Sequence, residues 1–80
     1  EETLDQTVSI YPNPVEEELT ISVNGILTIR KVRIYNVLGE KILEQTNSPN
    51  RLDLRKLDFG IHLVVIDTDQ GSLHKTILKK

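Results

Sequence analysis

The sequence has no cysteine, methionine, tryptophan or alanine, and only three of its 80 residues are aromatic. Without cysteine there is neither a disulfide nor a thiolate metal site, which leaves the cellular compartment open. The strongest helix former, alanine, is absent, whereas valine, isoleucine and threonine are frequent. The composition therefore favours a β protein whose core consists of leucine, isoleucine and valine.

Strong charge of one sign and long hydrophobic runs are also missing. The chain carries 10 basic and 12 acidic residues for a net charge of -2, which argues against a nucleic-acid binder. The longest apolar runs, such as residues 63–66, are far shorter than the roughly 20 residues that cross a bilayer. Acidic Glu1 and Glu2 stand where a secretion signal would begin, so we expect a cytosolic protein or a piece of a longer chain.

Aliphatic and polar residues alternate with period two along most of the chain. This pattern predicts strands at residues 8–11, 19–24, 32–37, 41–45, 51–54, 61–67 and 72–79. Turn signals roughly every 8–12 residues indicate an all-β fold, a seven-stranded immunoglobulin-like antiparallel β-sandwich. The 61–67 strand has aliphatics on both faces and is expected inside a sheet. Residues 26–29 lack clean alternation and are expected to form a loop or sheet crossing.

Turn-forming residues separate these strands. Pro12 and Pro14 remove ladder donors and end the first strand, and the side chain of Asn13 is expected to cap that turn locally. Gly39 is predicted to take a positive φ after a type I turn, and Gly71 to do the same in the last hairpin.

Three groups of polar residues are candidates for chemical sites. His62 and His74 lie within predicted strands without a nucleophile nearby. Asp67 and Asp69 have the spacing that starts a calcium loop, but the later ligand positions do not fit, so a tight hairpin turn is preferred. The acidic run 16–18 is interpreted as a solvated face. We therefore expect no catalytic, metal or cofactor site.

Four sequence blocks together carry a family resemblance. They are residues 8–14 (VSIYPNP), 32–41 (VRIYNVLGEK), 57–64 (LDFGIHLV) and 75–80 (KTILKK). In this order and spacing they closely resemble the C-terminal sorting domains of the type IX secretion system in the Bacteroidetes. The resemblance covers residues 7–80 and leaves residues 1–6 as a linker to an upstream cargo domain.

The resemblance implies a non-enzymatic folded secretion signal on a larger cargo protein. The cargo would pass through the periplasm, and the domain would be recognised by the outer-membrane translocon and its shuttle protein. A sortase-like peptidase would then remove the domain at the cell surface and join the cargo to an anionic lipopolysaccharide. The cut is expected in or before residues 1–6, because a linker can enter an active site that a folded strand cannot.

The resemblance also implies recognition residues. Gly60 matches the glycine of the family's Pro-x-Gly-x-Tyr block, although Asp58 and His62 replace its proline and tyrosine. The aliphatic residues that follow in this block are Leu63, Val64 and Val65.

The terminal lysines match a second family pattern. Lys75 and Lys79 fit a Lys-x-x-x-Lys pattern, with Lys80 following. Period two places Lys75, Ile77 and Lys79 on one face, with the two lysines about 13 Å apart. This face is predicted to dock with an acidic or strand-accepting groove of the translocon; the alternative is lysine protection of an edge strand. An exposed terminal strand also favours a strand-swapped homodimer at high concentration.

Two other functions fit the sequence less well. An adhesion or carbohydrate-binding module would stay on the mature protein and needs exposed aromatic rings, for which only Tyr11, Tyr35 and Phe59 are available. An enzyme is disfavoured because no nucleophile is paired with a base.

Overall fold

The computed structural model describes residues 8–25, 27–47 and 50–80. The predicted linker, residues 1–6, lies outside the described residues, as does Ile26 in the expected loop or crossing. Within the described part of the chain, no helix is long and apolar enough to cross a bilayer.

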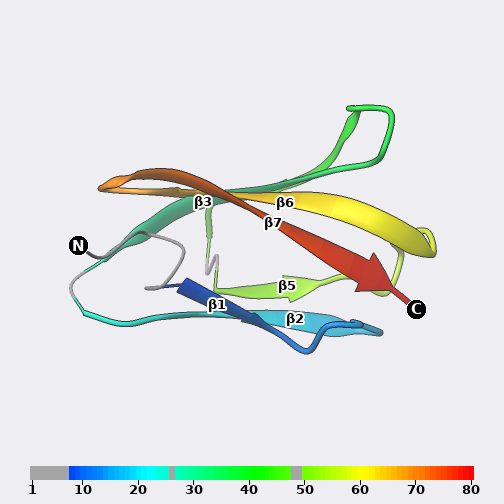
Figure 1. The fold of residues 1–80 in the computed structure, drawn as a ribbon, viewed down its shortest axis with the longest axis horizontal. Coiled ribbons are helices and arrows are strands. Elements are labelled where there is room, and N and C mark those ends of the chain that lie inside the picture. The colour runs from blue at the N-terminus through cyan, green and yellow to red at the C-terminus, as the bar shows by residue number, and fades with distance from the viewer. Residues whose placement is uncertain (1–7, 26, 48–49) are drawn as a thin grey trace.

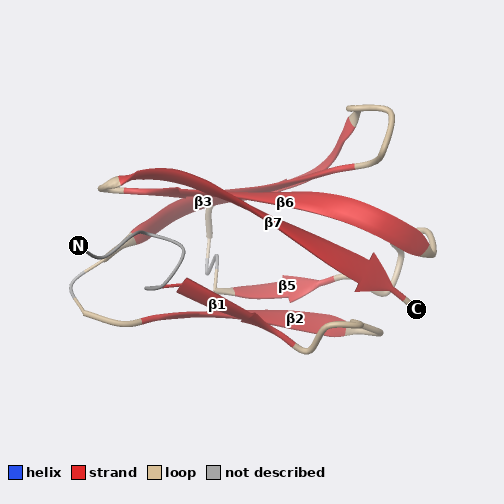
Figure 2. Ribbon diagram, viewed as in Figure 1, coloured by secondary structure: helices blue, strands red, loops and turns tan. Residues whose placement is uncertain are grey.

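Seven strands form two antiparallel sheets that face each other (Figures 1 and 2). The three-stranded sheet has the order β1-β2-β5, with β1 at Val8–Tyr11, β2 at Glu18–Val23 and β5 at Arg51–Asp53. The four-stranded sheet has the order β4-β3-β6-β7, with β3 at Ile29–Tyr35, β4 at Lys41–Gln45, β6 at Gly60–Thr68 and β7 at Gly71–Lys79. The predicted seven-stranded antiparallel sandwich is confirmed, and so is the interior place of β6.

Strand β3 differs most from its predicted range. It begins at Ile29, because residues 29–31 pair with β6 across a register shift that breaks the alternation. It ends at Tyr35, because the turn already starts at Asn36, whose side-chain oxygen accepts the N–H groups of Leu38 and Glu40, both at 3.0 Å. Gly39 in this turn has φ +86°, as predicted.

The core lies between the two sheets and is aliphatic, as the composition indicates. Its twelve buried residues are Val8, Val15, Leu19, Ile21, Val32, Ile34, Leu52, Leu54, Val64, Ile66, Leu73 and Ile77. Val15 and Leu54 reach this core from outside the strands, each held by a backbone hydrogen bond to another segment. The connections at this end of the sandwich are therefore packed against the strands.

Candidate recognition site

The predicted recognition residues lie on two paired strands. Strand β6 carries the glycine and the aliphatic block, and β7 carries the two lysines. The register places Gly60 opposite Lys79 and Val64 opposite Lys75. The two blocks are separated in the sequence, but the β6–β7 hairpin brings them side by side. Some of their side chains face the outer surface of the sheet and the others face the core. Both glycines of the hairpin, Gly60 (φ +121°) and Gly71 (φ +126°), have the positive φ that disfavours other residues.

The prediction of a solvent-exposed basic face is wrong at Lys79. Lys75, Ile77 and Lys79 do share one face, but that face turns toward the core, and Lys79 is only 4% exposed. Its ammonium group lies 5.2 Å from the ring centroid of Phe59 and donates to the carbonyl oxygen of Lys80 at 3.0 Å. The buried Ile77 two residues earlier fixes this orientation, and the lysine stem extends to the end of the sheet.

The aliphatic block divides between the two faces of β6. Val64 is fully buried in the core, where a partner cannot contact it in the folded domain. Leu63 and Val65 point to the outer face of the four-stranded sheet. There they line a shallow groove of about 500 Å³. Its other lining residues are Arg33, Tyr35, Asn36, Val37, Gly39 and His74.

The segment Asn13–Val15, which we call the clasp, covers part of the outer edge of β7. The side chain of Asn13 donates to the carbonyl oxygen of Thr76 at 3.3 Å and accepts the N–H of Leu78 at 2.9 Å. The N–H of Val15 donates to the carbonyl of Leu78, and its carbonyl accepts the N–H of Lys80, both at 2.8 Å. The expectation that Asn13 caps its own turn is therefore wrong, because its partners lie 63 and 65 residues away.

Replacing Asn13 with alanine is expected to lower the free energy of unfolding by about 1–2 kcal/mol, because two hydrogen bonds worth roughly 0.5–1.5 kcal/mol each are lost. Asn13→Asp keeps the acceptor for Leu78 and loses the donor to Thr76, so it should fall between the two. Urea unfolding midpoints of the three proteins check this order. Equal midpoints would show that the clasp hydrogen bonds do not hold the terminal strand.

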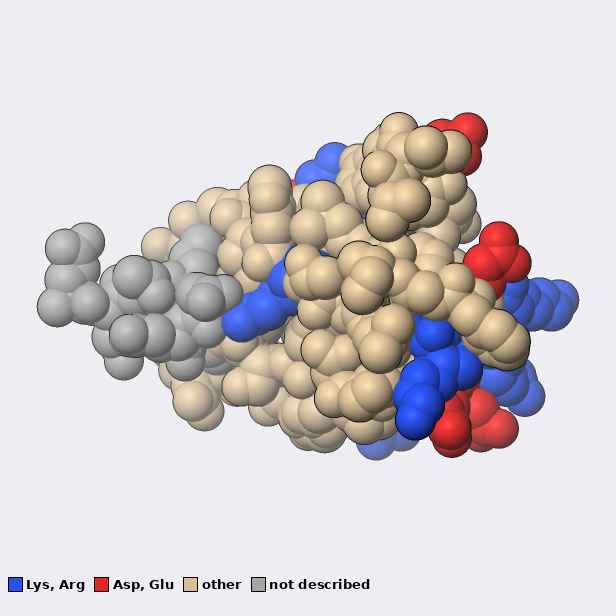
Figure 3. Space-filling model, turned by 45° about the vertical axis from the view of Figure 1, so that its right-hand side comes forward, with Lys and Arg blue, Asp and Glu red and all other residues tan. Residues whose placement is uncertain are grey.

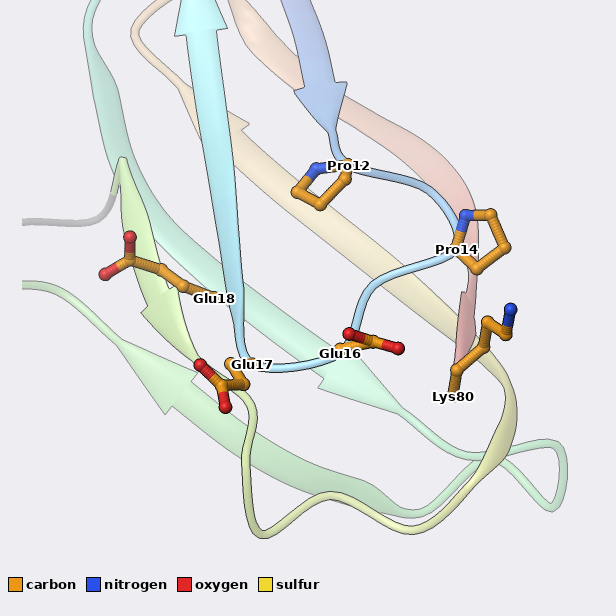
Figure 4. A pocket seen from close by; sticks show the side chains of 6 residues that line it. All are labelled: Pro12, Pro14, Glu16, Glu17, Glu18 and Lys80. Carbon is orange, nitrogen blue, oxygen red and sulfur yellow. The ribbon is translucent and has the colours of Figure 1, made fainter.

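A hollow of about 420 Å³ lies next to the clasp. It is lined by Pro12, Pro14, Glu16, Glu17, Glu18 and Lys80. In Figure 4 Glu16 and Lys80 lie on one side of this hollow, and Glu17 and Glu18 lie on the other. The three glutamates are exposed, as predicted for a solvated run. Most charged side chains visible in Figure 3 gather toward the right-hand end of that view, and uncharged surface covers its middle.

Three of the metal or catalytic candidates, His62, Asp67 and Asp69, bind other protein groups. The buried ring of His62 has Nδ1 3.1 Å from the carbonyl oxygen of Gly60. Asp67 pairs with Arg33 at 2.9 Å and accepts a hydrogen bond from the Ser72 hydroxyl. That hydroxyl contributes most to lowering the pKa of Asp67, and Arg33 adds to the effect.

Asp69 caps the neighbouring β2–β3 connection. Its carboxylate accepts the N–H of Thr28 at 3.0 Å. Among the residues that the structure describes, no three His, Cys, Asp or Glu side chains gather as a metal site.

The carboxyl group of Asp53 is strongly affected by its neighbour Arg55. Arg55 contacts it through its guanidinium at 2.8 Å and its backbone N–H at 3.1 Å, which lowers the pKa of Asp53 from 3.8 to about 2. Because the folded-state pKa is depressed, the stabilisation from this contact is present above about pH 4. It is lost as the pH falls toward 2.

Removing Arg55 as Arg55→Ala should return the pKa of Asp53 toward 3.8, because the main cause of the shift is gone. An NMR titration of the Asp53 carboxyl carbon measures this directly. Lys56→Ala is the matched control, since the charge of Lys56 contributes least to the shift. A titration midpoint that stays near 2 in Arg55→Ala would refute this explanation.

Sequence reasoning missed several residues that organise the site. Phe59 is 81% exposed and supplies the ring beside the Lys79 ammonium. Val15 is fully buried and forms an isolated parallel bridge to Lys79. A lone valine after two prolines is a weak signal, and only its apolar character in an acidic segment indicates that it is buried.

Comparison with known proteins supports the sequence resemblance. The family of secretion system C-terminal sorting domains matches residues 9–80. An ulvan lyase NLR42 of Nonlabens ulvanivorans is 28% identical over 75 residues, which cover 90% of this chain and 14% of the relative. An endo-acting ulvan lyase of Formosa agariphila is 28% identical over 81 residues, which cover 96% of this chain and 16% of the relative.

The chain thus spans only about a seventh of the length of these curated relatives. The shared part is a sorting domain, and proteins that carry it are exported to the cell surface or beyond. The domain is therefore a type IX secretion signal that interacts with the secretion machinery. With nearly its whole length matched, this chain belongs to the family of secretion system C-terminal sorting domains.

Proposed function

We propose that the β6–β7 hairpin is the part of the domain that the outer-membrane translocon and its shuttle protein read after the cargo has crossed the periplasm. The register that sets Gly60 opposite Lys79 and Val64 opposite Lys75 carries this proposal, because it joins both family blocks. Leu63 and Lys80 contribute accessible atoms, Val65 lines the groove although it is only 6% exposed, and Val64 and the stem of Lys79 support them from inside.

After export, a sortase-like peptidase cuts within or before residues 1–6 and joins the cargo to an anionic lipopolysaccharide. Support for the position comes from the start of the packed fold, because Val8 is already buried and paired with Val23 in β1–β2. A peptidase that needs an extended substrate therefore has to act upstream of Val8. The domain itself is discarded.

A reporter fused upstream of residues 1–80, in a host with the secretion system, tests this function. We expect the reporter at the cell surface or in the medium, with an intact mass that shows removal of the whole sandwich. Deleting residues 76–80 should stop export, because the deletion removes buried Ile77 and the partners of the clasp. Deleting residues 1–5, a change of equal length, should leave export intact, and the mass of the exported reporter then shows whether the cut lies within these residues or before them.

Two results would contradict the proposal. Export that survives loss of residues 76–80 would remove the terminal strand from recognition. An exported reporter that still carries all 80 residues would instead favour the retained adhesion or carbohydrate-binding module, for which the exposed ring of Phe59 offers a stacking surface.

A further inference from the structure

Strand β7 is a long edge strand, and the residues that the structure describes cover only half of its edge. It has nine residues, whereas β1 and β5, the edges of the other sheet, have four and three. Short edges are one way in which proteins avoid pairing with other chains. On β7 a different device is present, because the clasp takes up the backbone groups of Thr76, Leu78 and Lys80.

The clasp also shows which backbone groups point away from β6. In an antiparallel strand alternate residues direct both N–H and C=O to the same side. Since Leu78 turns both groups outward to the clasp, His74 and Ser72 turn theirs outward too, and so does the N–H of Thr76. Among residues 8–25, 27–47 and 50–80, none forms a hydrogen bond with the outward backbone groups of Ser72 or His74.

Next to this open edge lies the groove on the outer face of the sheet. His74 belongs to both, since it is a β7 residue and lines the groove together with Leu63 and Val65. A strand added to β7 would place alternate side chains on the outer face. The first of them would lie beside His74, where a long apolar side chain reaches the groove.

We propose that residues 72–76 are a strand-addition site, at which an extended segment of the secretion machinery pairs with the edge of β7. Main-chain hydrogen bonds supply the binding, and an apolar side chain in the Leu63–Val65 groove supplies selectivity. The clasp limits the site at Thr76 and leaves about 13 Å of edge for the partner. This inference rests on the proposed function and specifies how the hairpin is read.

Proline at position 74 tests the site directly. The N–H of His74 points away from β6, so His74→Pro removes a donor for the partner without removing a hydrogen bond of the β6–β7 ladder. Its ring also blocks the approach of another strand. We expect export of the reporter fusion to fall by about tenfold or more. His74→Ala keeps the backbone N–H and removes only part of the groove wall, so its export should fall much less than that of His74→Pro.

Folding of each variant is checked by thermal melting of the purified 80-residue domain. If His74→Pro does not fold, Thr76→Pro takes its place, because the N–H of Thr76 also points outward. Wild-type export by a folded proline variant would overturn the proposal. So would an equal loss of export in His74→Ala, since the imidazole and not the backbone would then be recognised.

Two further outcomes separate this proposal from its alternatives. A wild-type fusion that is not exported would refute the proposed function itself, before the edge is tested. A wild-type dimer in sedimentation equilibrium that His74→Pro converts to a monomer would assign the edge to a second copy of the chain, which would also overturn the proposal.

Discussion

Leu52→Ala is expected to remove about 2–5 kcal/mol of folding free energy, because truncation of a buried leucine leaves a cavity in the core. Leu52 lies in β5, is fully buried and pairs with Leu19, which is also fully buried. A domain of this size has roughly 4–12 kcal/mol in total, so the loss is a large fraction of its stability. Thermal melting should show a decrease of more than about 10 °C.

Leu38→Ala is the matched control, because the same atoms are removed at a position that is 81% exposed in the β3–β4 turn. Its melting temperature should stay close to that of the wild type. If both variants melt at the same temperature, the two-sheet core does not have Leu52 at its centre. Export of the Leu52→Ala fusion should also fall, since the machinery reads a folded hairpin.

Lys79 gives the second large expected effect. Replacement by alanine removes a buried aliphatic stem and the cation above the Phe59 ring, and should lower the free energy of unfolding by about 1–3 kcal/mol. Lys79→Met keeps an unbranched apolar side chain and should stay within about 1 kcal/mol of the wild type. Guanidinium unfolding midpoints measure both changes.

The variants Lys79→Ala and Lys79→Met also distinguish a packing role of Lys79 from a role in recognition by the secretion machinery. If the machinery reads the lysine charge, Lys79→Met folds and is not exported. If Lys79 is only structural, Lys79→Met is exported normally and Lys79→Ala loses export in proportion to its lost stability. Lys56→Ala, which removes an exposed lysine, should change neither property. A wild-type midpoint for Lys79→Ala would contradict the buried position of its stem.

Much of the fold was predictable, because the alternation of apolar and polar residues along a strand indicates which side chains are buried. Strand β4 has the predicted bounds, β6 extends one residue beyond its predicted range at each end, and β7 begins one residue earlier than predicted. Strand β3 was misplaced, because pairing with β6 and the side chain of Asn36 decide where it begins and ends. The two ends of β3 therefore depend on contacts with other residues, which the alternation of apolar and polar residues does not reveal.

The candidate site was predictable in its residues but less so in its geometry. Alternation correctly placed Lys75 and Lys79 on one face, yet Ile77 between them already marked that face as the core side. The clasp was beyond sequence reasoning, since the Asn13 side chain substitutes for a strand against residues more than 60 positions away. Only the folded chain brings these groups together.

The pairing of Val15 with Lys79, and of Asn13 with Leu78, links the first turn of the sandwich to its last strand. In a domain that lacks residues 76–80, neither Asn13 nor Val15 has its partner and the core lacks Ile77. We expect that such a truncated domain does not close the sandwich and therefore does not act as a secretion signal. The first turn thereby acts as a check on the last strand, because both must be present before the sandwich closes.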